Sequence, residues 1–452
     1  MIIFQITLAI LCFLWATYAV FARPKQIISM GFFLVFLGQF ARLPIPISDN
    51  GILLTDLLLP WILVLWFGKK LLFQRSLPRT FFGTFILIFL GTALLSVLLN
   101  SIALPAKELF SSSFYLIRLI AYFLYFYLCV EIVQEEKDQK IIIKELIITS
   151  VGLALAGIFQ YVFIPDFTFM AEEGWDPHIG RLLSTWYDPN YIAGFFAIVA
   201  GVVMSLWLYK EKKYNDLSSL GVTFILLLCI ALTFSRSGLV ALGIVILVIG
   251  ISKARPLIII GLIGLMLIIG FNERAQERAL GLFNGALSLI TGSLDYDLDA
   301  TSKLRVESWK QSTELMDDSY LYGIGYNTIQ YKKLTKGLIM DTKIHSGTGS
   351  DSSILNIFIT MGVLGLSAYS LLLWNIFSVG IRILTSKKDT MRFGKGIALG
   401  NIATWSALIL HSFFVNSLLL PFFILILIPL LAILDRQWHF LQTLRNNTYQ
   451  GT

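Results

Sequence analysis

Long apolar runs separated by short polar connections extend along nearly the whole chain. About 17 to 25 residues are needed to cross the hydrocarbon core of a bilayer. Runs of about that length fall near residues 2–21, 26–41, 51–68, 81–99, 110–132, 141–163, 191–209, 218–234, 238–252, 256–271, 352–377, 394–412 and 416–434. Lipid offers no hydrogen-bond partners, so the backbone of each run must pair within its own segment, as in an α-helix. The pattern predicts an all-α, polytopic transmembrane bundle of about 12–14 helices.

The composition supports a membrane environment. Of the 452 residues, 56% are hydrophobic and 14% are charged, whereas about 25% are charged in a soluble globular chain. The first run begins MIIFQITLAILCFLW and lacks the basic leader and small-residue cleavage site of a secretory signal. We therefore expect it to act as an anchor, and we expect residues 1–452 to form one integral membrane domain.

Basic residues accumulate in alternate connections. One set holds Arg23, Lys25, Lys69, Lys70, Arg75, Arg79, Lys137, Lys140, Lys144, Lys210, Lys212, Lys213, Lys253, Arg255, Arg382, Lys387, Lys388, Arg392 and Lys395, whereas the other short connections hold little more than Arg42, Lys107, Arg181 and Arg236. The positive-inside rule assigns the first set to the cytoplasm. A short loop, 164–190, and a large loop, 272–350, are then extracytoplasmic. The net charge of +7 reflects topology and contact with anionic lipid, without requiring nucleic acid.

Several common kinds of functional site are missing from the sequence. Cys12, Cys129 and Cys229 all fall inside apolar runs and have neither disulfide nor metal-ligand spacing. There is no P-loop, dinucleotide-binding glycine motif, zinc helix motif or internal repeat. A nucleotide-driven pump and a nucleotide-sugar enzyme are therefore disfavoured, and we predict no cofactor.

The short loop, PDFTFMAEEGWDPHIGRLLSTWYDPNYIAGF, holds the first group of candidate residues. Asp188 and Asn190 flank a proline at the start of an apolar run, where they are suited either to cap a helix or to support a site. Arg181 is either a site residue or a surface cation that extends to lipid headgroups. Trp175 and Trp186 favour the first reading, because they indicate a folded, interfacial segment.

Two further arginines lie close to or inside apolar runs. Arg236 interrupts two of them in LTFSRSGLVAL. It is either a helix C-terminal cap or a phosphate clamp, since the guanidinium fork fits two phosphate oxygens at once. Arg118, in SSSFYLIRLIAYF, lies deeper within a run. A charge inside a membrane is a site candidate by default, and the alternative is that this side chain reaches outward to water.

The large loop has a helical pattern of its own and a histidine. In SKLRVESWKQSTELM, one helical face holds Val306, Trp309, Thr313 and Met316, which predicts an amphipathic helix on the membrane surface or over a cavity. A glycine-containing turn, LYGIGYNT, follows. His345 lies a few residues before the next apolar run and is either a general base, the common role of imidazole near neutral pH, or an ordinary loop residue.

Four segments together resemble the O-antigen ligase and O-antigen polymerase superfamily of bacterial membrane glycosyltransferases. They are GRLLSTWYDPNYIAG (180–194), LTFSRSGLVAL (232–242), RVESWKQSTELMDDSYLYGIGYNT (305–328) and HSGTGSDSSILNIFITMGVLGL (345–366). Their order and spacing match that superfamily, as does the large loop, and they cover roughly the second half of the chain. The resemblance implies a GT-C-like helical fold in the bacterial cytoplasmic (inner) membrane, with an active site facing outward.

The resemblance also implies substrates and residue roles. The donor is an oligosaccharide on a polyprenyl diphosphate such as undecaprenyl diphosphate, and the acceptor is a glycan or a lipid, in exopolysaccharide or other cell-envelope assembly. Arg181, Arg236 and Arg305 match the arginine motifs, and His345 matches the base. Many relatives have Asn after that histidine, whereas this chain has Ser346. This departure leaves the local geometry of the base open.

We therefore expect a metal-independent, inverting glycosyltransferase. The expected site residues are His345 as base, Arg181, Arg236, Arg305 and Arg118 as diphosphate ligands, and Asp188, Asn190 and Glu307 as supporting groups. A polymerase is favoured over a ligase. The alternative is a transporter or flippase of lipid-linked oligosaccharide that breaks no bond. Such a protein is expected to have charges at mid-membrane and related repeats, of which the sequence offers only Arg118.

Overall fold

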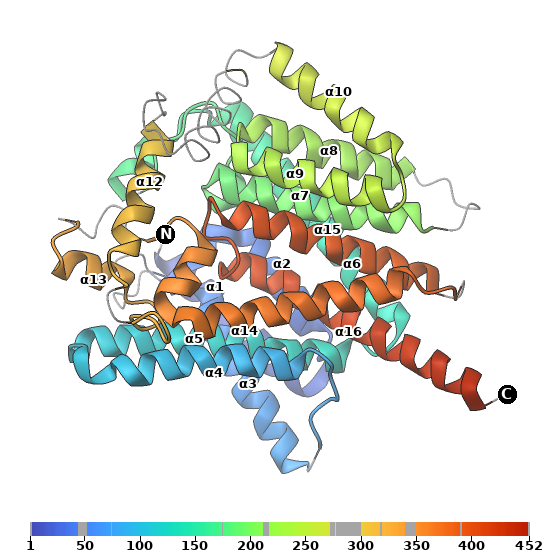
Figure 1. Cartoon of the computed structure of the whole chain (residues 1–452), viewed down its shortest axis with the longest axis horizontal. Helices are drawn as coiled ribbons and strands as arrows, with labels where there is room; N and C mark the ends of the chain where they lie inside the picture. The colour runs from blue at the N-terminus through green and yellow to red at the C-terminus, as the bar shows by residue number, and fades with distance from the viewer. Residues whose placement is uncertain are drawn as a thin grey trace.

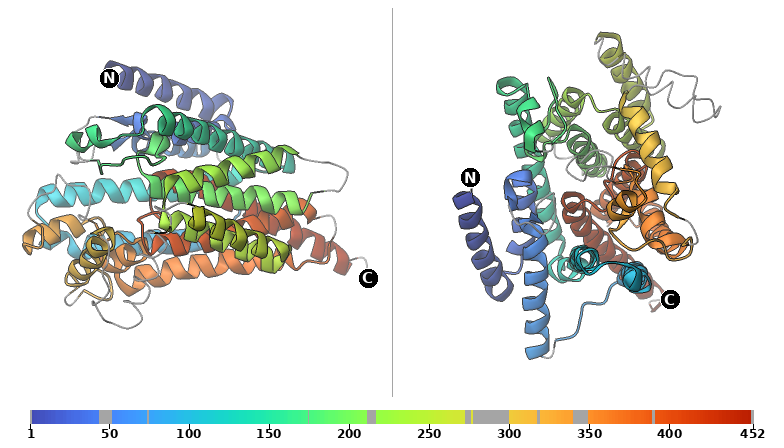
Figure 2. Two further views of the ribbon diagram at one scale, coloured as in Figure 1. Left: turned by 90° about the horizontal axis from the view of Figure 1, so that it is seen from above. Right: turned by 90° about the vertical axis from the view of Figure 1, so that its left-hand side faces the viewer.

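The computed structural model is a bundle of long helices lying side by side. It describes residues 2–43, 52–73, 75–173, 175–210, 217–271, 276, 300–316, 319–339, 349–388 and 391–450. Within these residues, eight helices are long and apolar enough to cross a membrane. The view from above in Figure 2 shows most of the long helices running in roughly the same direction. The predicted all-α transmembrane architecture is confirmed.

Each of the thirteen predicted apolar runs corresponds to a helix. The helices are α1 (Ile2–Ala22), α2 (Gln26–Leu37), α3 (Leu54–Leu72), α4 (Gly83–Asn100), α5 (Ala106–Ile132), α6 (Glu136–Phe163), α7 (Pro189–Leu208), α8 (Leu217–Thr233), α9 (Arg236–Ser252), α10 (Pro256–Phe271), α14 (Ser353–Leu384), α15 (Arg392–Ser412) and α16 (Pro421–Gln450). Among the described residues between α10 and α14, two further helices are α12 (Ala300–Thr313) and α13 (Ile329–Thr335). The short elements are η1 (Gly38–Ala41), η2 (Ser101–Ala103), η3 (Thr168–Glu173), η4 (Ser184–Trp186) and the antiparallel strands β1 (Arg42–Leu43) and β2 (Ile52–Leu53).

The core of the bundle lies around α16 and α7. In the most apolar part of α16, 94% of residues are buried, against 28% in α1. Helix α7 packs against α8, α9 and α15, and α16 packs against α5 and α15. Helix α1 leaves large apolar side chains exposed, among them Ile3, Ile10 and Leu14, as expected of a helix that faces lipid.

The basic connections gather at one end of the bundle, which we call the basic face. It is defined by five cations that contact neighbouring helices: Lys25 with Asp138, Lys70 with Glu131, Lys140 over Phe393, Lys253 over Tyr209 and Arg382 over Trp438. These contacts link segments that are far apart in the sequence. They place the alternate connections with high positive charge at the same end, as the charge pattern predicts.

Helices α12 and α13 lie at the opposite end, which we call the cavity face (Figure 1). Helix α12 ends at Thr313, so the buried Met316 lies beyond it. The predicted apolar face is not the buried one, because Val306 and Trp309 are half-buried and Thr313 is exposed, whereas Ser308 and Ser312 are buried. His345 falls in 341–348, outside the described residues, as does most of 272–299.

Helix α14 is broken at Gly362, and the large loop fills the break. Gly362 has φ of 67°, and the amides of Val363 and Leu364 donate to the carbonyls of Tyr320 and Leu321 (2.8 and 3.1 Å). In return, the amides of Ile324 and Gly325 donate to the carbonyls of Ile359 and Thr360 (3.0 and 3.3 Å). The loop backbone thus replaces hydrogen bonds that a continuous helix would make for itself.

Glycine is required at this crossing because two backbones touch. A Cβ on Gly362 would lie 2.4 Å from the carbonyl oxygen of Leu321. A Cβ on Gly323, in the loop, would lie 2.4 Å from the carbonyl carbon of Thr360. Irregular backbone at membrane depth is tolerated only where protein or water satisfies its polar groups. The LYGIG segment of the large loop therefore belongs to the helical bundle.

Candidate functional site

The connection between α6 and α7 packs against the C-terminal ends of α2 and α6. Trp186 is buried, and its indole N–H donates to the carbonyl of Val35 (2.9 Å). Gln160 of α6 accepts from the amide of Leu183 (2.8 Å) and donates to the carbonyl of Arg181 (3.3 Å). These bonds satisfy the backbone of a segment without regular structure. The tryptophan-based prediction of a folded segment is confirmed.

Arg181 joins this connection to the end of α8. Its Nε donates to the carbonyl of Thr233 (2.8 Å), and the amide of Leu182 donates to the carbonyl of Leu232 (3.0 Å). The last carbonyls of a helix have no partner within the helix, so Arg181 fills the C-terminal capping role that the sequence had suggested for Arg236. Arg236 is instead the first residue of α9 and is 7% exposed.

Asp188 caps α7, as its place before the proline predicts. Its Oδ1 accepts from the amides of Asn190 (2.7 Å) and Tyr191 (3.0 Å). The side chain of Asn190 accepts from the hydroxyl of Ser235 (2.8 Å), the N-cap of α9. The backbone oxygen of Asn190 lies 3.1 Å from Nε2 of the buried His411. The starts of α7 and α9 and the end of α15 are thereby held together.

A cavity of about 250 Å³ opens beside these residues. Its lining comes from η1, the α6–α7 connection, α7, α12, the approach to α14 and the α15–α16 connection. The lining residues that carry charge or imidazole are Asp176, His178, Asp188, Arg305 and Asp351. Within the part of the chain that the structure describes, no three His, Cys, Asp or Glu side chains are placed to hold a metal ion.

Burial and nearby guanidinium groups act in opposite directions on the cavity carboxylates. Burial raises the pKa of Asp188, against the effect of its two backbone hydrogen bonds and of Arg181 and Arg305. Burial also raises the pKa of Asp351, against the effect of Arg305 and Lys333. Asp351 has φ of 48°, and backbone strain of this kind is concentrated at functional sites. Arg305 therefore acts on carboxylates from two different connections.

Lys333 fixes the approach to α14. It is buried, and its ammonium donates to the carbonyl of Gly349 (2.7 Å) and lies 3.4 Å from the hydroxyl of Ser308 on α12. Burial lowers the pKa of Lys333 to about 8, although Asp351 and Glu307 act to raise it. Since Ser308 also donates to Gly349 (2.9 Å), α12, α13 and the segment before α14 form one unit, to which Arg305 of α12 belongs.

The structure brings together some of the predicted site residues. Asp188, Asn190 and Arg305 line the cavity. Arg181 lies within electrostatic range of Asp188, and Arg236 directly follows Ser235, which binds Asn190. Arg118 and Glu307 are not part of the lining, and His345 lies outside the described residues.

Arg118 belongs to a second polar cluster, at the start of α3. Its Nε lies 3.5 Å from Oδ1 of the buried Asp56, which also accepts from the hydroxyl of Tyr122 (2.9 Å). The guanidinium stacks over Tyr115, 4.9 Å from the ring centroid. A charge buried at a membrane boundary needs a partner of opposite sign. Asp56 supplies that partner for Arg118.

Sequence reasoning did not single out Asp176, His178 or Asp351 as site residues, nor His411 beneath them. Asp176 and His178 flank a proline in the short loop, and Asp351 directly precedes the Ser-Ser start of α14. Their positions at turns were the feature of the sequence that could have identified them as site residues. What brings them together is the packing of connections that lie far apart in the chain, which no local pattern encodes.

Comparison with known families identifies one part of the chain. The model of the family described as O-Antigen ligase matches residues 221–370, about a third of the chain. No curated protein matches the sequence. The matched region begins in α8 and ends within α14, so it contains Arg236, Arg305, Asp351 and the loop that fills the break in α14. The resemblance drawn from the four motifs is confirmed over this region.

Proposed function

We propose, on the premise that this chain is a membrane protein of the O-antigen ligase and polymerase type, that it transfers an oligosaccharide from a polyprenyl diphosphate to an acceptor hydroxyl. The observation that supports this proposal most directly is the cavity at the end of the bundle opposite the basic face. There Arg305, from the region that matches the family, faces Asp188 and Asp351. The positive-inside rule places that end outside the cytoplasm.

Three arginines form the proposed diphosphate site. Arg305 lines the cavity. Arg181 acts electrostatically on the lining residue Asp188, and Arg236 follows Ser235, whose hydroxyl donates to the lining residue Asn190. Negative charge grows on the diphosphate as it leaves, and guanidinium groups already in place stabilise that charge. Each contact is stronger at a partly dry membrane boundary than in bulk water. The positive end of the α9 dipole acts in the same direction.

The remaining chemistry requires a base and a binding surface for sugar. We assign the base to His345, whose imidazole would take the proton of the acceptor hydroxyl as that oxygen attacks the anomeric carbon. Asp188, which is electrostatically coupled to Arg181 and Arg305, would orient the two guanidinium groups. Asp176 and Asp351, on the cavity wall, would accept hydrogen bonds from sugar hydroxyls. Asn190 and Glu307 are supporting groups in this scheme.

Polymerisation is the working hypothesis for the product. It needs one kind of lipid-linked glycan, which serves as donor and as acceptor, whereas ligation needs a second, different acceptor. Incubation of the purified protein with a polyprenyl-diphosphate oligosaccharide alone separates the two. A ladder of longer lipid-linked glycans identifies a polymerase. Transfer that requires an added lipid or glycan acceptor identifies a ligase.

The decisive experiment compares variants on one helix in that assay. Arg305→Ala is expected to lower the turnover about 100-fold or more, as loss of one charge-stabilising donor does elsewhere. Arg305→Lys is expected to recover only part of it, because lysine keeps the charge without the planar fork. Lys310→Ala, an exposed change on the same helix, is the control. Movement of the lipid across a vesicle membrane without bond cleavage would overturn the proposal and identify a transporter.

A further inference from the structure

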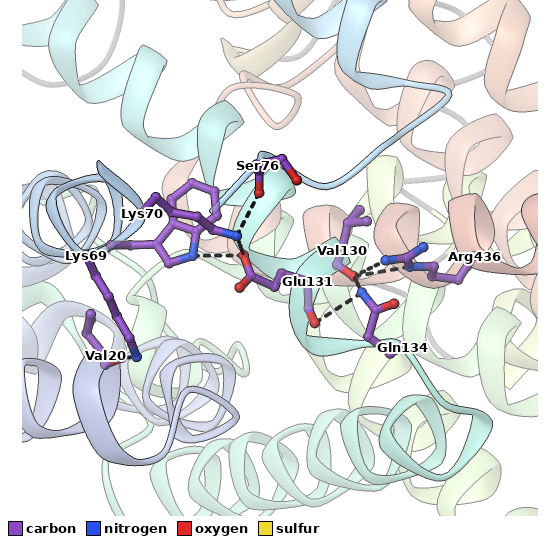
Figure 3. A network of polar contacts seen from close by, with 9 residues as sticks. Val20, Lys69, Lys70, Ser76, Val130, Glu131, Gln134 and Arg436 are labelled. Atoms are coloured by element: carbon purple, nitrogen blue, oxygen red, sulfur yellow. Dashed lines mark hydrogen bonds and ion pairs between the residues drawn. The ribbon is translucent and has the colours of Figure 1, made fainter. Parts of the chain in front are cut away.

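A second cavity lies at the basic face, at the opposite end of the bundle from the proposed active site. Its volume is about 240 Å³. It lies where the α1–α2 connection, the ends of α3 and α5 and the start of α6 meet. The lining residues are Val20, Pro24, Lys25, Ile27, Trp66, Lys69, Lys70, Arg75, Leu128, Glu131, Ile132, Gln134 and Asp138. Figure 3 shows part of this wall, with Lys70 pointing to Glu131 at the end of α5 and Lys69 pointing to Val20 at the end of α1.

The lining carries an excess of positive charge. Four cations (Lys25, Lys69, Lys70 and Arg75) are set against two carboxylates (Glu131 and Asp138), which leaves a formal charge of +2. The carboxylates hold two of the cations in place, since Lys25 contacts Asp138 and Lys70 lies 2.8 Å from Glu131. The charge of the other two cations is not balanced by a carboxylate of the lining.

Those two cations differ in how they are positioned. Lys69 donates to the backbone carbonyl of Val20 (2.8 Å), which orients the ammonium without neutralising it (Figure 3). Arg75 follows the end of α3 and is exposed. Its amide donates to the carbonyl of Lys70 (2.9 Å). Both side chains therefore present positive charge to a pocket that already excludes part of the solvent.

Most of the remaining wall is apolar. Ile27, Leu128 and Ile132 contribute hydrocarbon surface, and the indole N–H of Trp66 donates to Glu131 (3.0 Å). Next to the lining residue Glu131, the carbonyl of Val130 accepts from Arg436 of α16 (3.1 Å) and from Gln134 (2.7 Å), so the end of α5 is tied to α16 (Figure 3). Tryptophan with one apolar and one polar side is typical of the boundary between hydrocarbon and headgroups.

We propose that this cavity binds the phosphate of an anionic phospholipid. Basic pockets between transmembrane helices bind anionic headgroups. The apolar wall favours a lipid over a soluble phosphate, because it would cover the first carbons of the acyl chains. The lipid would join α1, α3, α5 and α6 and so stabilise the half of the bundle that lies outside the region matching the family. This site is independent of the proposed glycosyl transfer.

The test is native mass spectrometry of the full-length protein in detergent, titrated with phosphatidylglycerol. The Lys69→Gln/Arg75→Gln variant removes two charges and keeps a donor at position 69 for the carbonyl of Val20. It is expected to bind phosphatidylglycerol about 30-fold more weakly, from the typical attraction of two cations near an anionic surface. The single, exposed change Arg75→Gln is expected to weaken binding about 5-fold without affecting folding, which thermal unfolding checks.

The matched control is Lys137→Gln/Lys140→Gln. It removes two exposed charges from the same face, outside the cavity, and should leave the affinity for phosphatidylglycerol unchanged. An equal loss in this control would overturn the proposal in favour of a general surface attraction. Equal binding of zwitterionic phosphatidylcholine would also overturn it. So would complete competition by inorganic phosphate at equal concentration, which would assign the cavity to a soluble anion.

Discussion

Asp188 combines two roles that one pair of substitutions can separate. Its Oδ1 accepts both amide bonds that cap α7, at 2.7 and 3.0 Å, and its charge acts on Arg181 and Arg305. Asp188→Asn keeps an oxygen at the Oδ1 position but removes the charge. Asp188→Ala removes both. The structural role should therefore be lost in the alanine variant alone, and the electrostatic role in both variants.

The size of the structural effect follows from the cap. Replacing an N-cap Asp by Ala costs about 0.5–2 kcal/mol, and the partial burial of both hydrogen bonds places this helix toward the upper end of that range. Asp188→Ala should therefore unfold at a clearly lower temperature than the wild type, as measured by tryptophan fluorescence in detergent. Asp188→Asn should match the wild type at neutral pH or exceed it, because burial disfavours the carboxylate that asparagine replaces.

The pH dependence gives an independent check. Burial raises the pKa of Asp188 in the folded protein, so the folded state holds this proton more tightly than the unfolded chain does. The stability that results is fully present below the pKa of an unfolded Asp, about 3.9. It is lost as the pH rises through the higher folded-state pKa. The wild type should therefore lose stability relative to Asp188→Asn across that window, and the difference should stay constant above it.

Activity completes the test. Both variants should lose glycosyl transfer, because neither retains the charge that orients Arg181 and Arg305. An Asp188→Asn protein with wild-type turnover would refute the electrostatic role. An Asp188→Ala protein with wild-type thermal stability would refute the capping role.

Three further changes test other parts of the structure, each by its thermal unfolding midpoint. Gly362→Ala should destabilise the protein by about 1–2 kcal/mol or more, because the left-handed backbone and the close carbonyl both oppose a Cβ. The control Gly68→Ala, whose Cβ would meet nothing within 4 Å, should be neutral. Equal unfolding midpoints for the two variants would contradict the account of the α14 break. The wild type should gain stability between pH 8 and 10.5, because the unfolded chain holds a proton on Lys333 that the folded protein has released. Lys333→Met should abolish this rise, and a rise that persists in the variant would have another source. Arg118→Met should cost up to about 3–5 kcal/mol, because the buried Asp56 loses a guanidinium partner but keeps the hydrogen bond from Tyr122. Adding Asp56→Asn should recover part of the loss, and no recovery would show that the pair is not coupled.

The helices were predictable because each depends on its own segment. A run of apolar residues long enough to cross the bilayer forms a helix whatever lies beside it, so all thirteen runs correspond to helices. The cap at Asp188 is local as well, since the proline and the two amides follow it directly. By contrast, the central position of α16 and the break at Gly362 depend on neighbours, and their sequences resemble those of other apolar helices.

The site was predictable only in part, for the same reason. Arg181 could be recognised as unusual from its surroundings, but its partner, the carbonyl of Thr233, lies 52 positions away in the chain. Arg118 was recognised as a charge inside an apolar run, whereas its pairing with Asp56 requires α3 and α5 to be neighbours. Asp351 reaches the cavity only after the large loop has folded back onto α14. Long-range contacts of this kind are set by packing.

The break in α14 changes what the large loop is able to do. A long connection attached only at its ends could swing away from the membrane as one lid. Here the loop is also fastened in its middle, by the hydrogen bonds of Tyr320–Gly325 to the two halves of α14. The α12 and α13 segments on either side of this point are also tied to each other, through Lys333, Ser308 and Gly349. The described part of the loop therefore cannot leave α14 as one hinged piece without breaking both sets of hydrogen bonds.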